Sequence, residues 1–202
     1  MPSGEFITML KSIETRASKI MPENVTVSAQ AGLHTVLKAD QDIVNAQLGS
    51  LGITLASMFV VMAVLWRSFK LATIALATSL GPIALLTILG SLFQVPLNSV
   101  TVMVGALALG IGIDDTVHLI THWLSMKNNG ANQNEALAKT LEDKGPAIVC
   151  TSLILIGFSL SLLWMSFPPV TQFGWLSAAA YTAALGNALW ILPSFLGIKR
   201  SS

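Results

Sequence analysis

Residues 98–123 read NSVTVMVGALALGIGIDDTVHLITHW, and this stretch decides the fold. Only Asp114 and Asp115 carry a formal charge within it. An α-helix rises about 1.5 Å per residue and the hydrocarbon core of a bilayer is about 30 Å thick, so a helix of this length crosses a membrane. At that rise, Asp114 lies about 24 Å from Asn98 and about 14 Å from Trp123. The stretch therefore predicts a membrane-spanning helix with two adjacent carboxyl groups near the bilayer midplane.

The rest of the chain has the composition of a polytopic membrane protein. Of its 202 residues, 53% are hydrophobic and 10% are charged, whereas an ordinary soluble domain carries roughly 25% charged residues. Charges are absent from residues 43–66, 71–113 and 145–198, and proline-containing turns at 94–98 and 166–169 divide the two longer gaps. The predicted fold class is mainly α, a bundle of five transmembrane helices. We expect these helices near residues 47–66, 71–93, 98–123, 146–165 and 171–196.

Residues 1–45 differ from the membrane domain expected at 46–198. Residues 4–20 place apolar side chains at helical intervals with charged residues between them, and residues 25–29 alternate as a strand does. We therefore expect residues 1–45 to be a short α/β piece of an extracytoplasmic domain. No apolar run in this piece is suited to start its own export. Either the first membrane span exports its own N-terminal side or a preceding helix is missing, and we favour the second interpretation, a chain cut from a larger protein.

The distribution of lysine and arginine among the loops predicts the orientation of the chain in the membrane. With the N-terminus outside and the C-terminus in the cytoplasm, the outer loops contain no basic residue and the inner side is positive. The basic residues on that inner side are Arg67, Lys70, Lys127, Lys139, Lys144, Lys199 and Arg200. Residues 132–143 predict an amphipathic helix on the cytoplasmic membrane surface, which Lys144-Gly145-Pro146 ends. A net charge of +1 without a basic run argues against nucleic acid as a partner.

The two carboxyls are the candidate functional groups. An ionised Asp at the centre of a membrane helix costs about 2.5–3.5 kcal/mol on insertion scales, so a pair must face protein or water, meet a cation or bind protons. We expect Asp114 and Asp115 to point into the helix bundle and to exchange protons as one coupled site. His118 lies one turn further along, at an angle between them, and is the third candidate of this proton relay.

Small and polar residues complete the candidate site. Glycines let a neighbouring helix backbone approach closely, and those of this helix are Gly105, Gly110 and Gly112. Polar residues of the last two helices are candidate relay partners, namely Thr151, Ser152 and Asn187. The alternative for the two hydroxyls is a hydrogen bond to their own backbone. We expect His122, close to Trp123, to be an interfacial residue.

The motif from Gly110 to His118, in a helix preceded by Pro96-Leu97-Asn98, resembles the resistance-nodulation-division superfamily and especially its MMPL-type exporters. The resemblance covers nearly the whole chain. It extends to Gly157-Phe158, Phe173-Gly174 and Leu192-Pro193 in the last two helices. It implies the last five helices of a six-helix repeat, with residues 1–45 ending an extracytoplasmic porter domain.

The same resemblance implies a function and a location. Such proteins export hydrophobic or amphiphilic substrates across the plasma (inner) membrane and couple export to proton flow, a role that falls here to Asp114 and Asp115. The implied partners are the lipid bilayer, the substrate, and a missing N-terminal half or a companion membrane subunit, with an oligomer left open. Thr121-His122-Trp123 departs from the basic and aromatic continuation of many members, which leaves the inner end of a relay open.

Three other interpretations compete with an exporter. The strongest is a binding or regulatory module that holds lipid without pumping, as sterol-sensing relatives do. An intramembrane aspartyl protease needs acids on facing helices, and the other predicted spans contain none. A metal site at Asp114, His118 and His122 has the helical spacing but lacks a fourth ligand. We therefore expect neither an enzyme nor a cofactor.

Overall fold

The computed structural model describes residues 3–20 and 32–197, and every regular element in these ranges is helical. The elements are α1 (Ser3–Ile20), α2 (Gly32–Trp66), α3 (Phe69–Ser79), α4 (Gly81–Leu92), α5 (Ser99–Asn128), α6 (Gln133–Ser161), the 3₁₀ turn η1 (Leu162–Trp164), α7 (Pro168–Gly186), the π-helical turn η2 (Asn187–Ile191) and α8 (Leu192–Gly197). The amphipathic N-terminal helix is confirmed as α1. The strand expected at residues 25–29 lies outside the described residues, so an α/β piece has no support.

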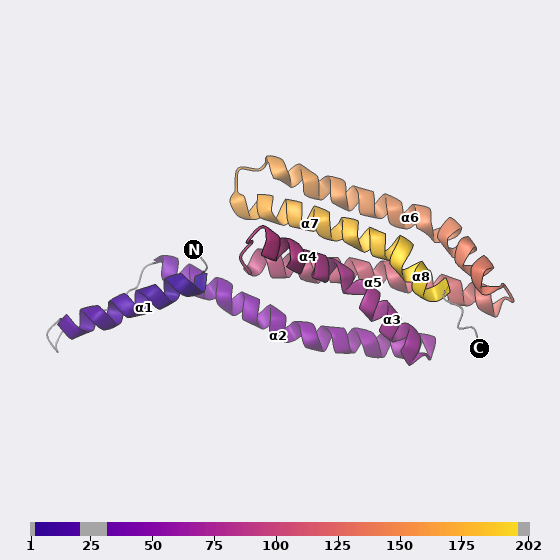
Figure 1. The fold of residues 1–202 in the computed structure, drawn as a ribbon, viewed down its shortest axis with the longest axis horizontal. Helices are drawn as coiled ribbons and strands as arrows, with labels where there is room; N and C mark the ends of the chain where they lie inside the picture. The colour runs from indigo at the N-terminus through magenta and orange to yellow at the C-terminus, as the bar shows by residue number, and fades with distance from the viewer. Residues whose placement is uncertain (1–2, 21–31, 198–202) are drawn as a thin grey trace.

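Within residues 3–20 and 32–197, five segments are long and apolar enough to cross a membrane, which confirms the predicted number. They are Lys38–Trp66, Phe69–Leu92, Ser99–Asn128, Gln133–Trp164 and Pro168–Gly197. Figure 1 shows them running back and forth, with the α2–α3 and α5–α6 connections at one end and the α4–α5 and α6–α7 connections at the other. We call the first of these the Lys-rich end, because it carries Arg67, Lys70, Lys127, Lys139 and Lys144.

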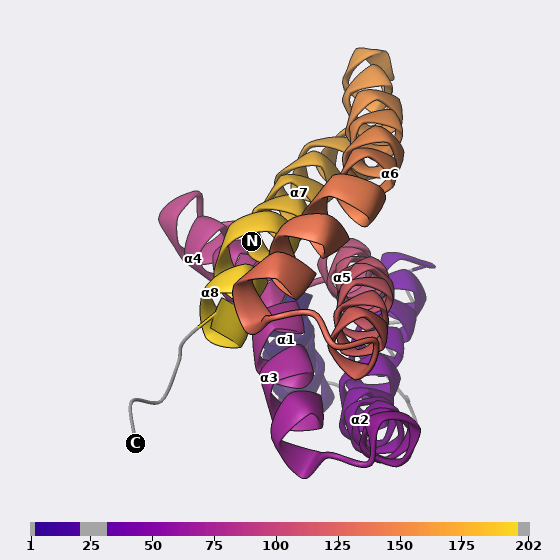
Figure 2. The same ribbon diagram turned by 90° about the vertical axis from the view of Figure 1, so that its right-hand side faces the viewer.

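The helix with the two carboxyls is central in the bundle. α5 packs against α2, α3, α4, α6 and α7. The end-on view in Figure 2 places α6 and α7 on one side of α5 and α2 and α3 on the other. Large apolar side chains such as Val64, Ile154 and Trp190 are exposed on the outside, where lipid covers them. A change in α5 therefore reaches every membrane segment directly.

The expected end of the surface helix is wrong because the helix continues through it. The surface helix expected at 132–143 is the first part of α6, and Pro146 lies inside that helix. A single proline removes one backbone hydrogen bond and bends a helix without having to end it, and α6 is visibly bent in Figure 1. α2 runs unbroken from Gly32 to Trp66 across residue 45, and the domain boundary expected there stays a prediction.

The second span is divided into α3 and α4 at Leu80, just before Gly81 and Pro82. Pro82 has no N–H group, so the carbonyl of Thr78, four residues earlier, has no donor within the helix. The side-chain amide of Asn187 donates to this carbonyl at 3.2 Å. A Cβ atom at Gly81 would overlap that amide, so glycine is required here.

Polar contacts fix the N-terminal end of α5. Asn98 and Thr101 form a reciprocal capping box at the first turn. The Asp40 carboxylate accepts a hydrogen bond from the Ser99 backbone N–H at 3.1 Å, and the Asn98 amide donates to Gln172 at 3.2 Å. These contacts join the start of α5 to α2 and to α7.

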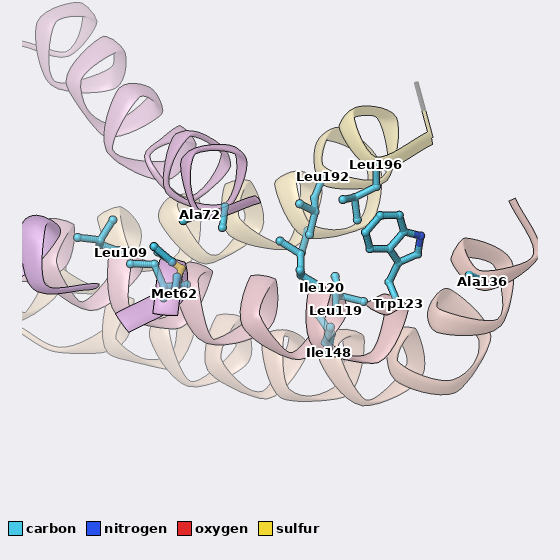
Figure 3. Packing of buried hydrophobic residues seen from close by; sticks show 14 residues of the cluster. Met62, Ala72, Leu109, Leu119, Ile120, Trp123, Ala136, Ile148, Leu192 and Leu196 are labelled. Carbon is cyan, nitrogen blue, oxygen red and sulfur yellow. The ribbon is translucent and has the colours of Figure 1, made fainter. Parts of the chain in front are cut away.

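The largest buried cluster lies in the half of the bundle toward the Lys-rich end. It joins α2, α3, α5, α6 and α8, and its buried members include Met62, Ala72, Ile120, Trp123 and Leu192 (Figure 3). Lipid tails are as apolar as these side chains, so close van der Waals packing provides the stabilisation.

Candidate functional site

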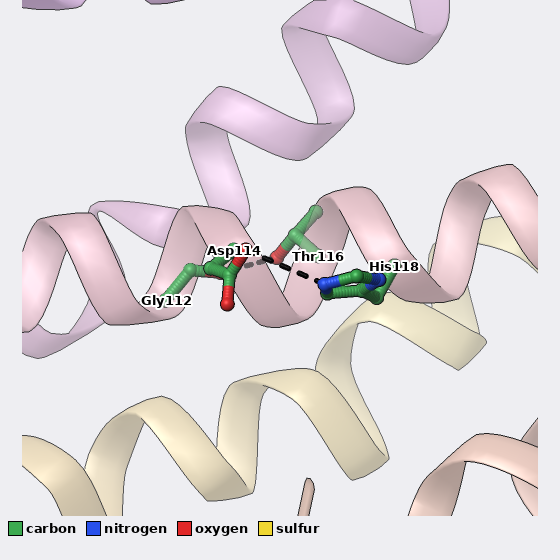
Figure 4. Close-up of polar contacts among 4 residues, drawn as sticks. All are labelled: Gly112, Asp114, Thr116 and His118. Atoms are coloured by element: carbon green, nitrogen blue, oxygen red, sulfur yellow. Dashed lines mark hydrogen bonds and ion pairs between the residues drawn. The ribbon is translucent and has the colours of Figure 1, made fainter.

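Asp114 faces away from the bundle, together with His118 one turn along α5. The Asp114 Oδ1 and His118 Nε2 atoms are 3.5 Å apart, and the two side chains are 73% and 67% exposed, respectively. Figure 4 shows the two side chains lying along the outside of the same helix. The structure thus brings these two candidates together as an i, i+4 pair in the middle of a membrane span.

Asp115, in contrast, is buried, with 7% of its surface exposed. Its Oδ2 atom is buried and has no hydrogen-bond partner among the described residues. The expectation that both carboxyls point inward is therefore wrong for Asp114. Adjacent helical residues are about 100° apart, and the inward stripe of α5, which includes Ala108, Gly112 and Leu119, contains only the second aspartate.

Two hydroxyls beside Asp115 were not predicted from the sequence. Thr116 donates to the Gly112 carbonyl at 2.7 Å, and its hydroxyl oxygen lies 3.4 Å from the Ser79 hydroxyl of α3. Both residues are buried. The available signal was a hydroxyl residue immediately following the aspartate pair and another just before the Gly81-Pro82 break. They form a polar contact between α5 and α3 next to the buried carboxyl.

The three glycines of α5 have different surroundings. A Cβ atom at Gly112 would lie 3.8 Å from the Ser79 carbonyl oxygen and 4.0 Å from the Ala184 side chain, so neighbouring helices approach closely there. At Gly105 and Gly110 an added Cβ would meet no atom of the described residues within 4 Å. Close packing by this chain is thus found at one of the three. A tighter position is Gly174, where a Cβ would lie 2.7 Å from the Ser159 carbonyl oxygen.

Among the described residues, none of the candidate relay partners is hydrogen-bonded to either carboxyl. The exposed Thr151 hydroxyl is bonded to its own backbone, at the carbonyls of Ala147 and Ile148 (both 3.1 Å). Ser152 is buried on α6, and no hydrogen bond joins it to either carboxyl in the described part of the chain. Asn187 is occupied at the α3–α4 break.

His122 faces α6 and not the aspartate pair. Its Nδ1 atom is 3.1 Å from the hydroxyl of Thr140, and its Nε2 atom is 3.4 Å from the Asp143 carboxylate. Within residues 3–20 and 32–197, no three His, Cys, Asp or Glu side chains gather as a metal-binding group. The metal alternative therefore has no ligand cluster in this part of the chain.

A cavity opens at the end opposite the Lys-rich end, and we call it the Thr54 cavity. It has a volume of about 600 Å³ and lies between α2, α4 and α5. Its walls are mostly aliphatic, and its hydroxyl groups belong to Ser50, Thr54, Thr87, Ser91 and Thr101. Gln47 also lines it, with a buried Oε1 atom that has no hydrogen-bond partner among the described residues. The cavity suits a molecule with an apolar body and a polar group.

Comparison with known proteins agrees with this architecture. A protein of Methanocaldococcus jannaschii, described as a membrane protein, is 25% identical over 108 residues. The matched part is 54% of this chain and 28% of that relative, so the chain spans less than a third of its relative's length. The profile of the MMPL family matches residues 4–199. With nearly its whole length matched, this multi-pass membrane protein belongs to the MMPL family.

Proposed function

We propose that the chain is part of a membrane transporter that exports hydrophobic or amphiphilic molecules and is driven by proton flow through Asp114, Asp115 and His118. The observation that carries this proposal is the exposure of the Asp114–His118 pair in the middle of a membrane-spanning helix. An exposed ionisable pair is unstable against hydrocarbon. Another part of the transporter or a water-filled path must therefore cover it.

A companion membrane half is the occupant that fits this face. The pair lies on the central helix and points away from the other helices of the chain, so a second helical bundle packed there encloses both side chains. Enclosure gives the pair a protein environment in which protons can be exchanged without contact with lipid. The companion is either the N-terminal half of the same protein or a separate subunit.

Asp115 connects the proton site to the helix packing. Its buried, unbonded oxygen lies one residue from Thr116, which contacts Ser79 of α3. Adding or removing a proton changes the charge in this packed interface, and such a change favours one of two helix arrangements over the other. The close approach at Gly112 places α3 and α7 next to this part of α5.

The Thr54 cavity supports the substrate class. Aliphatic walls accommodate an acyl or ring system, while the unbonded Gln47 oxygen and the hydroxyls bind a polar group. The same cavity favours a second candidate, a module that binds lipid without pumping. The two candidates differ in whether Asp114 and Asp115 matter for movement of the bound molecule.

The proposed location is the plasma (inner) membrane. The Lys-rich end faces the cytoplasm under the positive-inside rule, which places α1 outside and α8 ending inside.

The decisive experiment measures the hydrophobic dye Nile red and internal pH together in vesicles that contain the complete transporter. We expect Asp114→Asn and Asp115→Asn each to abolish proton-coupled dye movement while membrane insertion is retained. Asp143→Asn, at an exposed carboxylate outside the site, is the matched control. Unchanged transport in both site variants overturns the relay, and dye binding without any coupled movement in the unsubstituted protein supports the binding module.

A further inference from the structure

A second cavity lies at the Lys-rich end, and we call it the Lys70 cavity. Its volume is about 690 Å³, and its polar lining consists of Lys70 from the start of α3, Lys127 from the last turn of α5 and Gln133 from the start of α6. We infer that this cavity binds the phosphate group of an anionic lipid. The inference does not depend on proton-driven transport, since the cavity is separate from Asp114 and from the Thr54 cavity.

The charge in the cavity is positive and not neutralised. Among the described residues, neither Lys70 nor Lys127 forms an ion pair, and the cavity lining contains no carboxylate. Of the acids on α6, Glu135 pairs with Lys139 at 3.7 Å, Asp143 pairs with His122 at 3.4 Å, and Glu142 does not line the cavity. Two cations facing one cavity attract an anion.

The position of Lys127 is further defined by an aromatic ring. Its Nζ atom lies 4.7 Å from the centroid of the Trp123 ring, which restricts where the ammonium group points. Trp123 is buried and lines the same cavity. The ammonium group is thus held at the cavity wall while keeping N–H groups free for an anion.

The remaining lining selects a lipid over a free anion. Leu71, Ile74, Phe195 and Leu196 supply apolar walls, and Phe195 is 50% exposed. Lys70 lies at the beginning of the second membrane span, at the level where lipid phosphates meet the hydrocarbon core. Inorganic phosphate gains nothing from apolar walls, whereas a phospholipid places its glycerol and first acyl carbons against them.

A hydrogen bond between α6 and α8 closes one side of the cavity. The Gln133 side-chain amide donates to the carbonyl of Leu196, which ties the start of α6 to α8. A lipid phosphate on Lys70 and Lys127 would add a link between α3 and α5 at the same level.

The test is native mass spectrometry of the full chain released from detergent after incubation with an equimolar mixture of phosphatidylglycerol and phosphatidylcholine. We expect phosphatidylglycerol adducts to exceed phosphatidylcholine adducts by roughly thirtyfold, since two basic residues contribute about 1 kcal/mol each. The Lys70→Gln/Lys127→Gln variant should lose this preference. The matched control is Lys139→Gln, which removes a lysine from the same end of the bundle but outside the cavity and should keep it.

Further arms identify the occupant and guard against misfolding. The Lys70→Arg/Lys127→Arg variant should retain the preference. If the double Gln variant fails to fold, the single variants Lys70→Gln and Lys127→Gln are measured in its place, and each should lose part of the preference. Excess inorganic phosphate should leave the lipid adduct in place. Equal binding of the two lipids, an undiminished preference in the folded Gln variants, or displacement of the lipid by inorganic phosphate overturns the inference.

Discussion

The Asn187 side-chain amide donates to the Thr78 backbone carbonyl at 3.2 Å, and this is the carbonyl that Pro82 leaves without a helical donor. Asn187 is the first residue of the π-helical turn η2, so one hydrogen bond connects the break in the second span to the irregular turn in the last span. Membrane helices tolerate proline when a neighbouring helix satisfies the freed backbone group. Asn187 has this structural role, and among the described residues no hydrogen bond joins its amide to the aspartate pair.

Replacing Asn187 with Leu is expected to destabilise the bundle by about 1–2 kcal/mol, because the Thr78 carbonyl then has no donor in an apolar interior. Thermal unfolding of the purified protein in detergent measures this loss. Asn134→Leu, at an exposed position of α6, is the control and should leave the melting temperature unchanged. Equal melting temperatures for Asn187→Leu and the unsubstituted protein would contradict the assigned role.

Gly174→Ala is expected to destabilise the α6–α7 hairpin by about 1–3 kcal/mol, because its Cβ atom meets the Ser159 carbonyl oxygen at 2.7 Å and the two helices must separate. Gly157→Ala, on exposed α6 surface with no neighbour within 4 Å among the described residues, should instead stabilise the helix by about 0.5–1 kcal/mol. Chemical unfolding of both variants tests the opposite signs. A Gly174→Ala variant as stable as Gly157→Ala would show that the hairpin is looser than described.

Asp114 and His118 are expected to act as one unit in proton-coupled transport. Asp114→Asn and His118→Gln should each reduce the rate of Nile red movement in vesicles, and the double variant should lose no more than the more severe single variant. The control cycle uses Asp143→Asn and His122→Gln, the other His–carboxylate pair on α5 and α6, which should retain transport. Losses at Asp114 and His118 that simply add would indicate independent roles.

Gly105→Leu is expected to fill part of the Thr54 cavity without a clash, since an added Cβ meets nothing within 4 Å among the described residues. Binding of Nile red to the purified chain, followed by its fluorescence, should weaken several-fold while the melting temperature is retained. The control Gly157→Leu places the same side chain on α6, outside the cavity. Unchanged dye binding in Gly105→Leu would place the dye elsewhere.

Much of the architecture was predictable because the cost of burying charge in lipid is large. The gaps between charged residues give the number of spans and the proline-containing turns between them. The ends of the helices were not predictable from hydrophobicity. α5 continues through Ser125 to Asn128 and α6 begins at Gln133, since a polar helix projecting into water keeps its backbone hydrogen bonds.

The residue types of the site were predictable from the sequence, but the directions in which the two aspartate side chains point were not. Aspartates in a membrane span stand out in any sequence, but α5 is apolar around most of its circumference, so no amphipathic pattern indicates which aspartate faces inward. The role of Asn187 was also hidden, because its partner Thr78 lies 109 positions away in the chain. Only the packing of the helices brings the proline break and this amide together.

Because α2 is one unbroken helix, its two ends move together as a rigid body. A helix of 35 residues is a rod about 50 Å long, and it has no proline or break between Gly32 and Trp66. Near its first turns the rod is fastened through Asp40 to the beginning of α5. A tilt of α2 therefore displaces the start of α5, the helix that carries the carboxyls.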